Sequence, residues 1–227
     1  MPLRSCNAVA ASRRTLVAAV LALALVAGCG DDTTENVEAA DQLIEVAKGA
    51  TANASVASPL DDLRTVVGSD TVDDPWAEAV VVGEVVAAAP GAAYREESPG
   101  SAVSEQVPFD DATAQWRTIE LTFAVDEVLR GDIVGDELTV GFTIGGDVDE
   151  VGRGFAELGR LVLPIYSGSP VFDHREGVWS IVGDGQLLMT VADDGSLAMP
   201  FAEDGLEDVL LRSIATIDVL RDVTRSG

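Results

Sequence analysis

Residues 116–125 read WRTIELTFAV, and this stretch decides the fold class because its side chains alternate without a break. One face carries Arg117, Ile119, Leu121, Phe123 and Val125, and the other carries Trp116, Thr118, Glu120, Thr122 and Ala124. A period of two is typical of a β-strand that has one buried face and one solvated face. We therefore predict a strand here, in a domain that is mainly β.

Further strand patterns lie on both sides of this stretch. Residues 79–87 read AVVVGEVVA, and Gly83 within them predicts a bulge or a sharp bend of the sheet. Residues 89–106, which contain Pro90, Gly91, Pro99 and Gly100, are expected to form a long loop. Downstream, we predict strands at 137–144, 161–166 and 178–182, a short helical turn at 155–158, and a hairpin of 187–191 with 196–199.

Two details complete the predicted domain. Pro164 cannot donate a backbone hydrogen bond, so it predicts an edge or a bulge in its strand. In the tail, Leu206, Leu210, Ile214 and Ile217 recur at helical spacing, with Asp204 near the start and Arg221 near the end. This pattern predicts one amphipathic helix within 201–227, packed on the β domain at 76–200.

The first residues have the features of an export signal. Arg4, Arg13 and Arg14 make a positive start, residues 16–27 are apolar, and Gly28-Cys29 follows. The uncharged stretch covers only residues 15–30, and a helix needs about 20 residues to span a bilayer. The pattern therefore favours a signal peptide at 1–28 over a membrane-spanning helix.

Val26-Ala27-Gly28-Cys29 resembles the lipobox of bacterial lipoproteins. The resemblance implies cleavage between Gly28 and Cys29, and fatty acylation of Cys29 through a diacylglycerol on its thiol. Two or more acyl chains hold a protein stably on a membrane. The expected location is thus the outer face of the cytoplasmic membrane or the cell envelope. Ser12-Arg13-Arg14-Thr15-Leu16 also resembles a twin-arginine export signal, so that route stays open beside the general one.

Residues 29–57 are rich in acidic and small residues, and this composition predicts a flexible tether. A short helix around 38–48 is the alternative, with Leu43, Ile44 and Ala47 on one side. Ser58-Pro59 predicts a helix start, so 58–75 is expected to be a short helical segment.

Charge and cysteine content exclude several functions. Without residues 1–28 the chain has 11 basic residues against 39 acidic ones, a net charge of −28. Nucleic-acid binding needs clustered basic side chains, so no nucleic-acid partner is expected. Cys6 lies within the signal, so Cys29 would be the only cysteine left and a disulfide is excluded. Stability must come from a hydrophobic core.

Three short phrases resemble extracellular OB-fold barrels of the netrin and metalloproteinase-inhibitor kind: Val82-Gly83-Glu84-Val85, Val128-Leu129-Arg130-Gly131, and residues 158–163, LGRLVL. The resemblance covers about residues 78–185 and implies an OB-like five-stranded barrel, with an extra hairpin and the C-terminal helix outside it. A β-sandwich remains the alternative. Those inhibitors chelate a metal through a free N-terminal cysteine, whereas Cys29 would be acylated, so their activity does not carry over.

The sequence gives little support for catalysis or metal binding. His174 is the only histidine, and no nucleophile motif accompanies it. The start of a calcium-binding loop is matched by Asp147, Asp149 and Glu150, but Leu158 stands where that loop needs a bidentate acid. The sequence therefore leaves room only for a weak, irregular calcium site, and no cofactor is expected. Arg130-Gly131-Asp132, an adhesion tripeptide in other proteins, is explained here by a turn.

We therefore expect a non-catalytic module that binds an envelope protein or a glycan, with a carboxylate-based hydrolase as the rival. The candidate contact residues are Trp116, Trp179 and Tyr166, together with Trp76, and each of these aromatics is at least as well suited to a core position.

Overall fold

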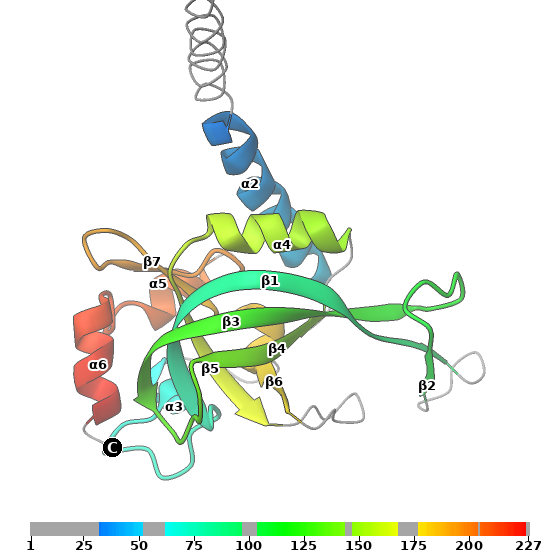
Figure 1. Cartoon of the computed structure of the whole chain (residues 1–227). Coiled ribbons are helices and arrows are strands. Elements are labelled where there is room, and N and C mark those ends of the chain that lie inside the picture. The colour runs from blue at the N-terminus through cyan, green and yellow to red at the C-terminus, as the bar shows by residue number, and fades with distance from the viewer. Residues whose placement is uncertain are drawn as a thin grey trace, which may run out of the picture.

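The computed structural model describes residues 32–51, 62–96, 104–143, 147–167, 177–203 and 205–225. In this part the protein is mainly β, and one mixed sheet has the strand order β2-β1-β3-β4-β6-β5-β7-β8 (Figure 1). The strands are β1 (Ala79–Glu96), β2 (Ser104–Val107), β3 (Trp116–Arg130), β4 (Glu137–Thr143), β5 (Leu161–Ser167), β6 (Val178–Ile181), β7 (Met189–Val191) and β8 (Leu197–Ala198). The helices are α2 (Asp32–Thr51), α3 (Arg64–Val67), α4 (Val148–Glu157), a 3-10 turn η1 (Val182–Gly185), α5 (Leu206–Leu210) and α6 (Ile217–Arg225).

Five of the strands close a ring. β1 pairs with β3 along most of its length, and its first residues also pair with β5, so that β1, β3, β4, β6 and β5 follow one another in a circle. The β4–β6 pair is parallel, and the other neighbours in the ring are antiparallel.

The prediction for β3 is confirmed, because Ile119, Leu121 and Phe123 are buried while the residues between them are partly exposed. β4 alternates in the same way, with Leu138, Val140 and Phe142 buried. Gly83 lies at a register shift between β1 and β3, as its position in the apolar run predicted. The hairpin of β7 and β8 is also confirmed, since Ala192 N donates to Ser196 O.

The prediction of a loop is wrong at 89–96 and at 104–106, and residues 97–103 lie outside the described part of the chain. β1 continues to Glu96 and pairs at its end with β2. Register shifts between Val85 and Ala87, and between Pro90 and Ala93, absorb the irregular residues. Among the described strands, β1 pairs only with β3 between Gly83 and Ala93. Pro90 lies in this stretch, where β1 has no second partner strand, so the backbone N–H group that proline lacks is not needed on that side.

Pro164 lies inside the sheet rather than at its rim. It is paired with Val80 of β1. On its other side β5 pairs with β7 up to Val162 and with β6 from Ile165 onward. The proline therefore occupies the step between two partner strands, where a donor is not required.

The first hydrophobic core fills the ring. It includes inward residues of all five ring strands, together with Leu43 and Ala47 of α2 and Val151 and Phe155 of α4. Phe155 stacks edge-on against Phe142 and against Phe201, with ring centroids 5.2 Å and 5.8 Å away. In Figure 1, α2 crosses α4 on one side of the ring. The two helices thus close the core that the strands begin.

A second core lies on the outer side of β1 and β5. Val80, Val82 and Val162 point into it, and it is covered by α3, α5, α6 and the β7–β8 hairpin. The neighbouring residues Ala79 and Val81 point into the first core. The beginning of β1 is therefore buried on both faces, which explains why its sequence is continuously apolar rather than alternating.

The segment expected to be a tether contains helix α2, and the alternative helix around 38–48 is the better description of it. Leu43 and Ala47 are buried, and Ile44 packs against the same core. The acidic composition suggested solvation, but these three residues form an apolar stripe that α4 covers. The expected helix start at Ser58 lies outside the described residues, and α3 is a single turn.

The prediction of one C-terminal helix is wrong, because the tail forms two helices, α5 and α6. The backbone between them joins the hairpin: Leu197 N donates to Ala215 O, and Ile217 N donates to Gly195 O. The four apolar residues of the predicted stripe still reach the second core. Pairing with the hairpin therefore overrides the helical periodicity.

An ion pair fastens α6 to β3, and it leads to a pH-dependent prediction. Arg221 donates from Nε to both carboxylate oxygens of Glu127 at 3.1 Å and from Nη2 to Oε2 at 2.8 Å. This hydrogen bonding holds the pKa of Glu127 below its ordinary value. A lowered folded-state pKa stabilises the protein above the ordinary pKa of about 4.3, and the stabilisation is lost as the pH falls through the folded value.

We expect Glu127→Gln to lower the free energy of unfolding by about 1 kcal/mol at pH 7, near the upper end for a pair that stays partly exposed, because the contact is bidentate. Below about pH 4 the difference from the wild type should shrink. Urea unfolding curves across this pH range measure it, with Glu84→Gln at an exposed site as the control. A difference that stays constant with pH would contradict the assignment.

Candidate functional site

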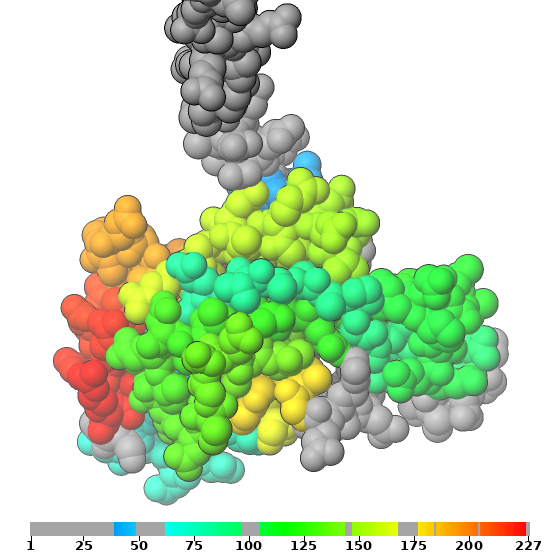
Figure 2. All heavy atoms as spheres, viewed as in Figure 1, coloured from blue at the N-terminus to red at the C-terminus, as the bar shows by residue number. Residues whose placement is uncertain are grey.

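A projecting β arm is the most distinctive surface feature of the described chain. The end of β1 pairs with β2 on one side and with the start of β3 on the other: Tyr94 lies opposite Gln106 and opposite Trp116. Figure 1 shows this three-stranded end extending sideways from the ring, and Figure 2 shows it standing out from the body of the molecule.

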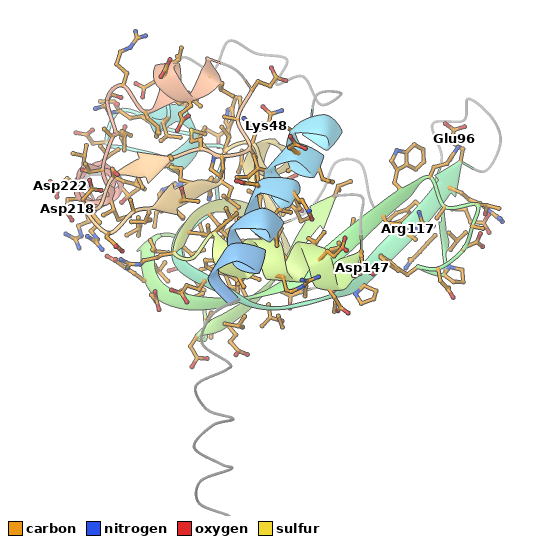
Figure 3. The ribbon with its side chains drawn as sticks, turned by 90° about the horizontal axis from the view of Figure 1, so that it is seen from above. Lys48, Glu96, Arg117, Asp147, Asp218 and Asp222 are labelled. Atoms are coloured by element: carbon orange, nitrogen blue, oxygen red, sulfur yellow. The ribbon has the colours of Figure 1, made fainter. Side chains whose placement is uncertain are left out.

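The loop at 108–115, which joins β2 to β3, is held by hydrogen bonds from one side chain, that of Arg117. The guanidinium of Arg117 donates to three of its carbonyl oxygens, those of Phe109 at 2.8 Å, Asp111 at 2.7 Å and Ala114 at 3.4 Å. Two further bonds tie the loop to β1: Gln115 N donates to Tyr94 O at 2.8 Å, and the Gln115 side chain accepts from Glu96 N. Figure 3 labels Arg117 and Glu96 on the arm.

Arg95 and Glu105 form an ion pair on the arm. Arg95 donates to Glu105 from Nε at 3.0 Å and from Nη2 at 2.8 Å, and from Nη1 to the Thr113 hydroxyl at 3.2 Å. Asp111 Oδ1 accepts from both the backbone and the hydroxyl of Thr113, which lowers the pKa of Asp111. These contacts give the loop a fixed shape, and a surface that is fixed before binding loses less entropy on binding.

Trp116 stands at the base of this loop with 37% of its surface exposed. The other two sequence-predicted contact residues lie elsewhere. Trp179, on β6, packs against the first core, whereas Tyr166, on β5, packs against the second. The register pairs Tyr166 with Ser180 and Trp179 with Ser167, so these two side chains lie on opposite faces of the sheet. The structure does not bring the three aromatics together.

Next to the arm, the outer face of β3 and β4 is rich in threonine. Thr118 lies opposite Thr143, and Thr122 lies opposite Thr139, with the pair Glu120 and Gly141 between them. Thr118 has a structural task, since its hydroxyl accepts from Ala92 N and lies 3.2 Å from Ala92 O. The alternation of residues 116–125 predicts the two faces of β3 but not this surface, because the arm that borders it was expected to be a loop.

The acids of the suspected calcium loop start a helix. Asp147 is the N-cap of α4, and its Oδ1 accepts from Asp149 N at 3.0 Å and Glu150 N at 3.2 Å. Capping accounts for this aspartate without an ion. Among the residues that the structure describes, no three potential ligands gather in a way that suits a metal ion.

The Arg130-Gly131-Asp132 tripeptide is a structural turn. Arg130 Nη1 donates to Ala77 O at 2.7 Å, and its guanidinium lies against Gly68. Gly131 has φ +88° and lies against the backbone of Glu78 and Ala79. The arginine is thus already engaged within the fold.

Gly28, Cys29 and His174 lie outside the described residues. None of the helices in the described part is both long and apolar enough to cross a bilayer. Comparison with family models, with curated proteins and with solved structures finds no match to this chain.

Proposed function

We propose that this chain is a lipid-anchored protein of the cell envelope, whose folded part is a non-catalytic module that binds a protein or a glycan. The lipobox-like Val26-Ala27-Gly28-Cys29 after a charged and apolar leader supports the anchor. The net charge of −28 without the leader, from 11 basic and 39 acidic residues, fits a soluble body that does not adhere to anionic head groups.

The folded part is proposed to be an OB-like barrel with additions. The closed ring of five strands supports this. The position of α4 also supports it, because α4 lies in the chain between β4 and β5, which are the third and fourth ring strands in sequence order. In this description the β7–β8 hairpin and the helices α5 and α6 are the extra elements. Barrels of this kind often present loops and one sheet face for recognition.

The observation that carries the binding role is the braced loop at 108–115 with the exposed Trp116 at its base. A loop held by three hydrogen bonds from one arginine is preorganised, and an exposed tryptophan offers a large contact area at low entropic cost. The threonine-rich face beside it can donate and accept hydrogen bonds. A ligand seated here would touch both surfaces.

Replacing Cys29 tests the anchor. We expect Cys29→Ala protein to take up no radiolabelled palmitate and to leave the membrane fraction, because the thiol that carries the diacylglycerol is gone. Fractionation and labelling of cells that express either form measure both effects. Palmitate label on the variant, or no label on the wild type, would refute the anchor.

Two tryptophans of nearly equal exposure test the binding surface. We expect Trp116→Ala to weaken binding about tenfold or more, the size typical of a central aromatic contact. Trp76, 39% exposed and remote from the arm in sequence and sheet position, provides the matched control, since Trp76→Ala removes the same side chain elsewhere. The probes are co-sedimentation with purified cell-wall glycan and cross-linking to envelope proteins in intact cells.

A second variant separates shape from contact. Arg117→Met leaves Trp116 in place but removes the three hydrogen bonds to the loop, so it should also weaken binding. Both variants should unfold at nearly the wild-type urea concentration. Equal retention of every probe by Trp116→Ala, Trp76→Ala and the wild type would rule out the arm as the binding surface.

A further inference from the structure

Helix α2 packs into the core of the folded domain. Leu43 and Ala47 are 3% and 0% exposed, and both belong to the core that fills the ring. Val46, on the same helix, is 43% exposed. One face of α2 is thus buried and the other is solvated, as expected for a helix docked on a domain.

The contact between α2 and α4 is close. Gly154 of α4 faces Leu43 and the carbonyl oxygen of Ala39, and a β-carbon at Gly154 would lie 2.7 Å from Leu43 Cβ and 2.9 Å from Ala39 O. Ala40 N donates to Glu157 Oε2 at 2.9 Å. Absence of a side chain at Gly154 therefore lets the two backbones approach, and this fixes α2 in one position.

We infer that α2 is a rigid post that sets the height and the orientation of the domain above the lipid surface, with the α2–α4 side toward the membrane. This inference rests on the lipid anchor proposed for Cys29. Only Gly30 and Asp31 separate Cys29 from the first residue of α2. Three Cα–Cα steps span at most about 11 Å.

The lengths distinguish a post from a tether. From Asp32 to Ala39, where the described contacts with α4 begin, the helix rises by about 10 Å. The domain is thus held within roughly 20 Å of the attachment point. A flexible chain over 29–57 would instead have a root-mean-square span of about 30 Å and no fixed direction.

The orientation follows from the picture of the fold. In Figure 1 the N-terminal end of α2 lies at the top and the connection between β3 and β4 lies at the bottom, while the arm extends to the side. Val134, in that connection, is 94% exposed. Val134 should therefore be the far side of an anchored molecule, and the arm should face neighbours at the same height above the membrane.

Energy transfer to a labelled lipid tests this on the full, acylated chain. Because Cys29 would be blocked by its lipid, Val46→Cys and Val134→Cys each give one reactive thiol for a donor dye. A domain of this size has a radius of gyration of about 16 Å, so the two sites differ in height by a large part of a typical transfer distance. We expect transfer from position 46 to be at least about twofold more efficient than from position 134.

Inserting five Gly/Ser residues between Gly30 and Asp31 should bring the two efficiencies together, since the post loses its fixed direction. The same insertion after Gly135, where the structure has open space, should leave them apart. Equal efficiencies in the acylated protein without any insertion would overturn the post and leave the anchor intact. Failure of palmitate labelling and of vesicle binding would instead overturn the anchor, and the post with it.

Discussion

Replacing Gly83 with alanine should lower the free energy of unfolding by about 3 kcal/mol or more, at the upper end for overpacking, because the clash is with backbone. A β-carbon at Gly83 would overlap the carbonyl oxygen of Ala124 on β3 and would lie 2.9 Å from the Phe123 ring. The strand cannot move away, since Gly83 also pairs with Leu161 of β5. The substitution thus affects the residue at which β1 pairs with both β3 and β5.

Gly141 provides the matched control for this prediction. It also lies in a ring strand, β4, but a β-carbon there would meet only the Val178 Cγ1 atom at 3.2 Å and a backbone oxygen at 3.7 Å. Gly141→Ala should therefore cost less than about 1 kcal/mol. Urea unfolding followed by tryptophan fluorescence, on the chain from residue 29 with Cys29→Ser, measures both. Equal effects would contradict the proposed role of Gly83.

Truncation of Phe155 should have the second large effect, a loss of about 3–5 kcal/mol. The Phe155 ring is fully buried and stands edge-on between Phe142 and Phe201, at interplanar angles of 90° and 87°. Phe155→Ala would leave a cavity where α4, β4 and the tail meet. The two remaining rings are 5.9 Å apart and would not fill it without repacking.

Phe155→Leu keeps most of the volume and should cost less than half as much as Phe155→Ala. The same unfolding measurement applies, and the slope of the curve checks that both variants still unfold in two states. A loss below about 1 kcal/mol for Phe155→Ala would mean that α4 is not packed into the ring as described.

The structure agrees with the sequence pattern where a single local pattern determines it. The strict alternation at 116–125 and 137–143 is confirmed, because each of these strands buries one face in the ring. The prediction is wrong where pairing with a distant strand determines the structure. Pro90 and Gly91 suggest a loop by their own preferences, but pairing with β3 over fifteen residues carries β1 past them. No local signal shows that partner.

The predictions for the C-terminal helix and for the contact aromatics were incomplete for related reasons. The stripe from Leu206 to Ile217 predicts burial correctly, but the helix breaks because the backbone at 215–217 bonds to the hairpin. Among the aromatics, composition alone cannot tell an exposed ring from a buried one. Only the register shows that Trp179 and Tyr166 face opposite cores while Trp116 lies on the arm.

The double burial of the first residues of β1 has a consequence for how the molecule unfolds. Ala79 and Val81 belong to one cluster and Val80 and Val82 to the other, so adjacent peptide units serve both. Melting of either cluster would pull the shared strand out of the other. The two halves should therefore melt together, in a single all-or-none transition, although α5, α6 and the hairpin resemble an appendage in the sequence.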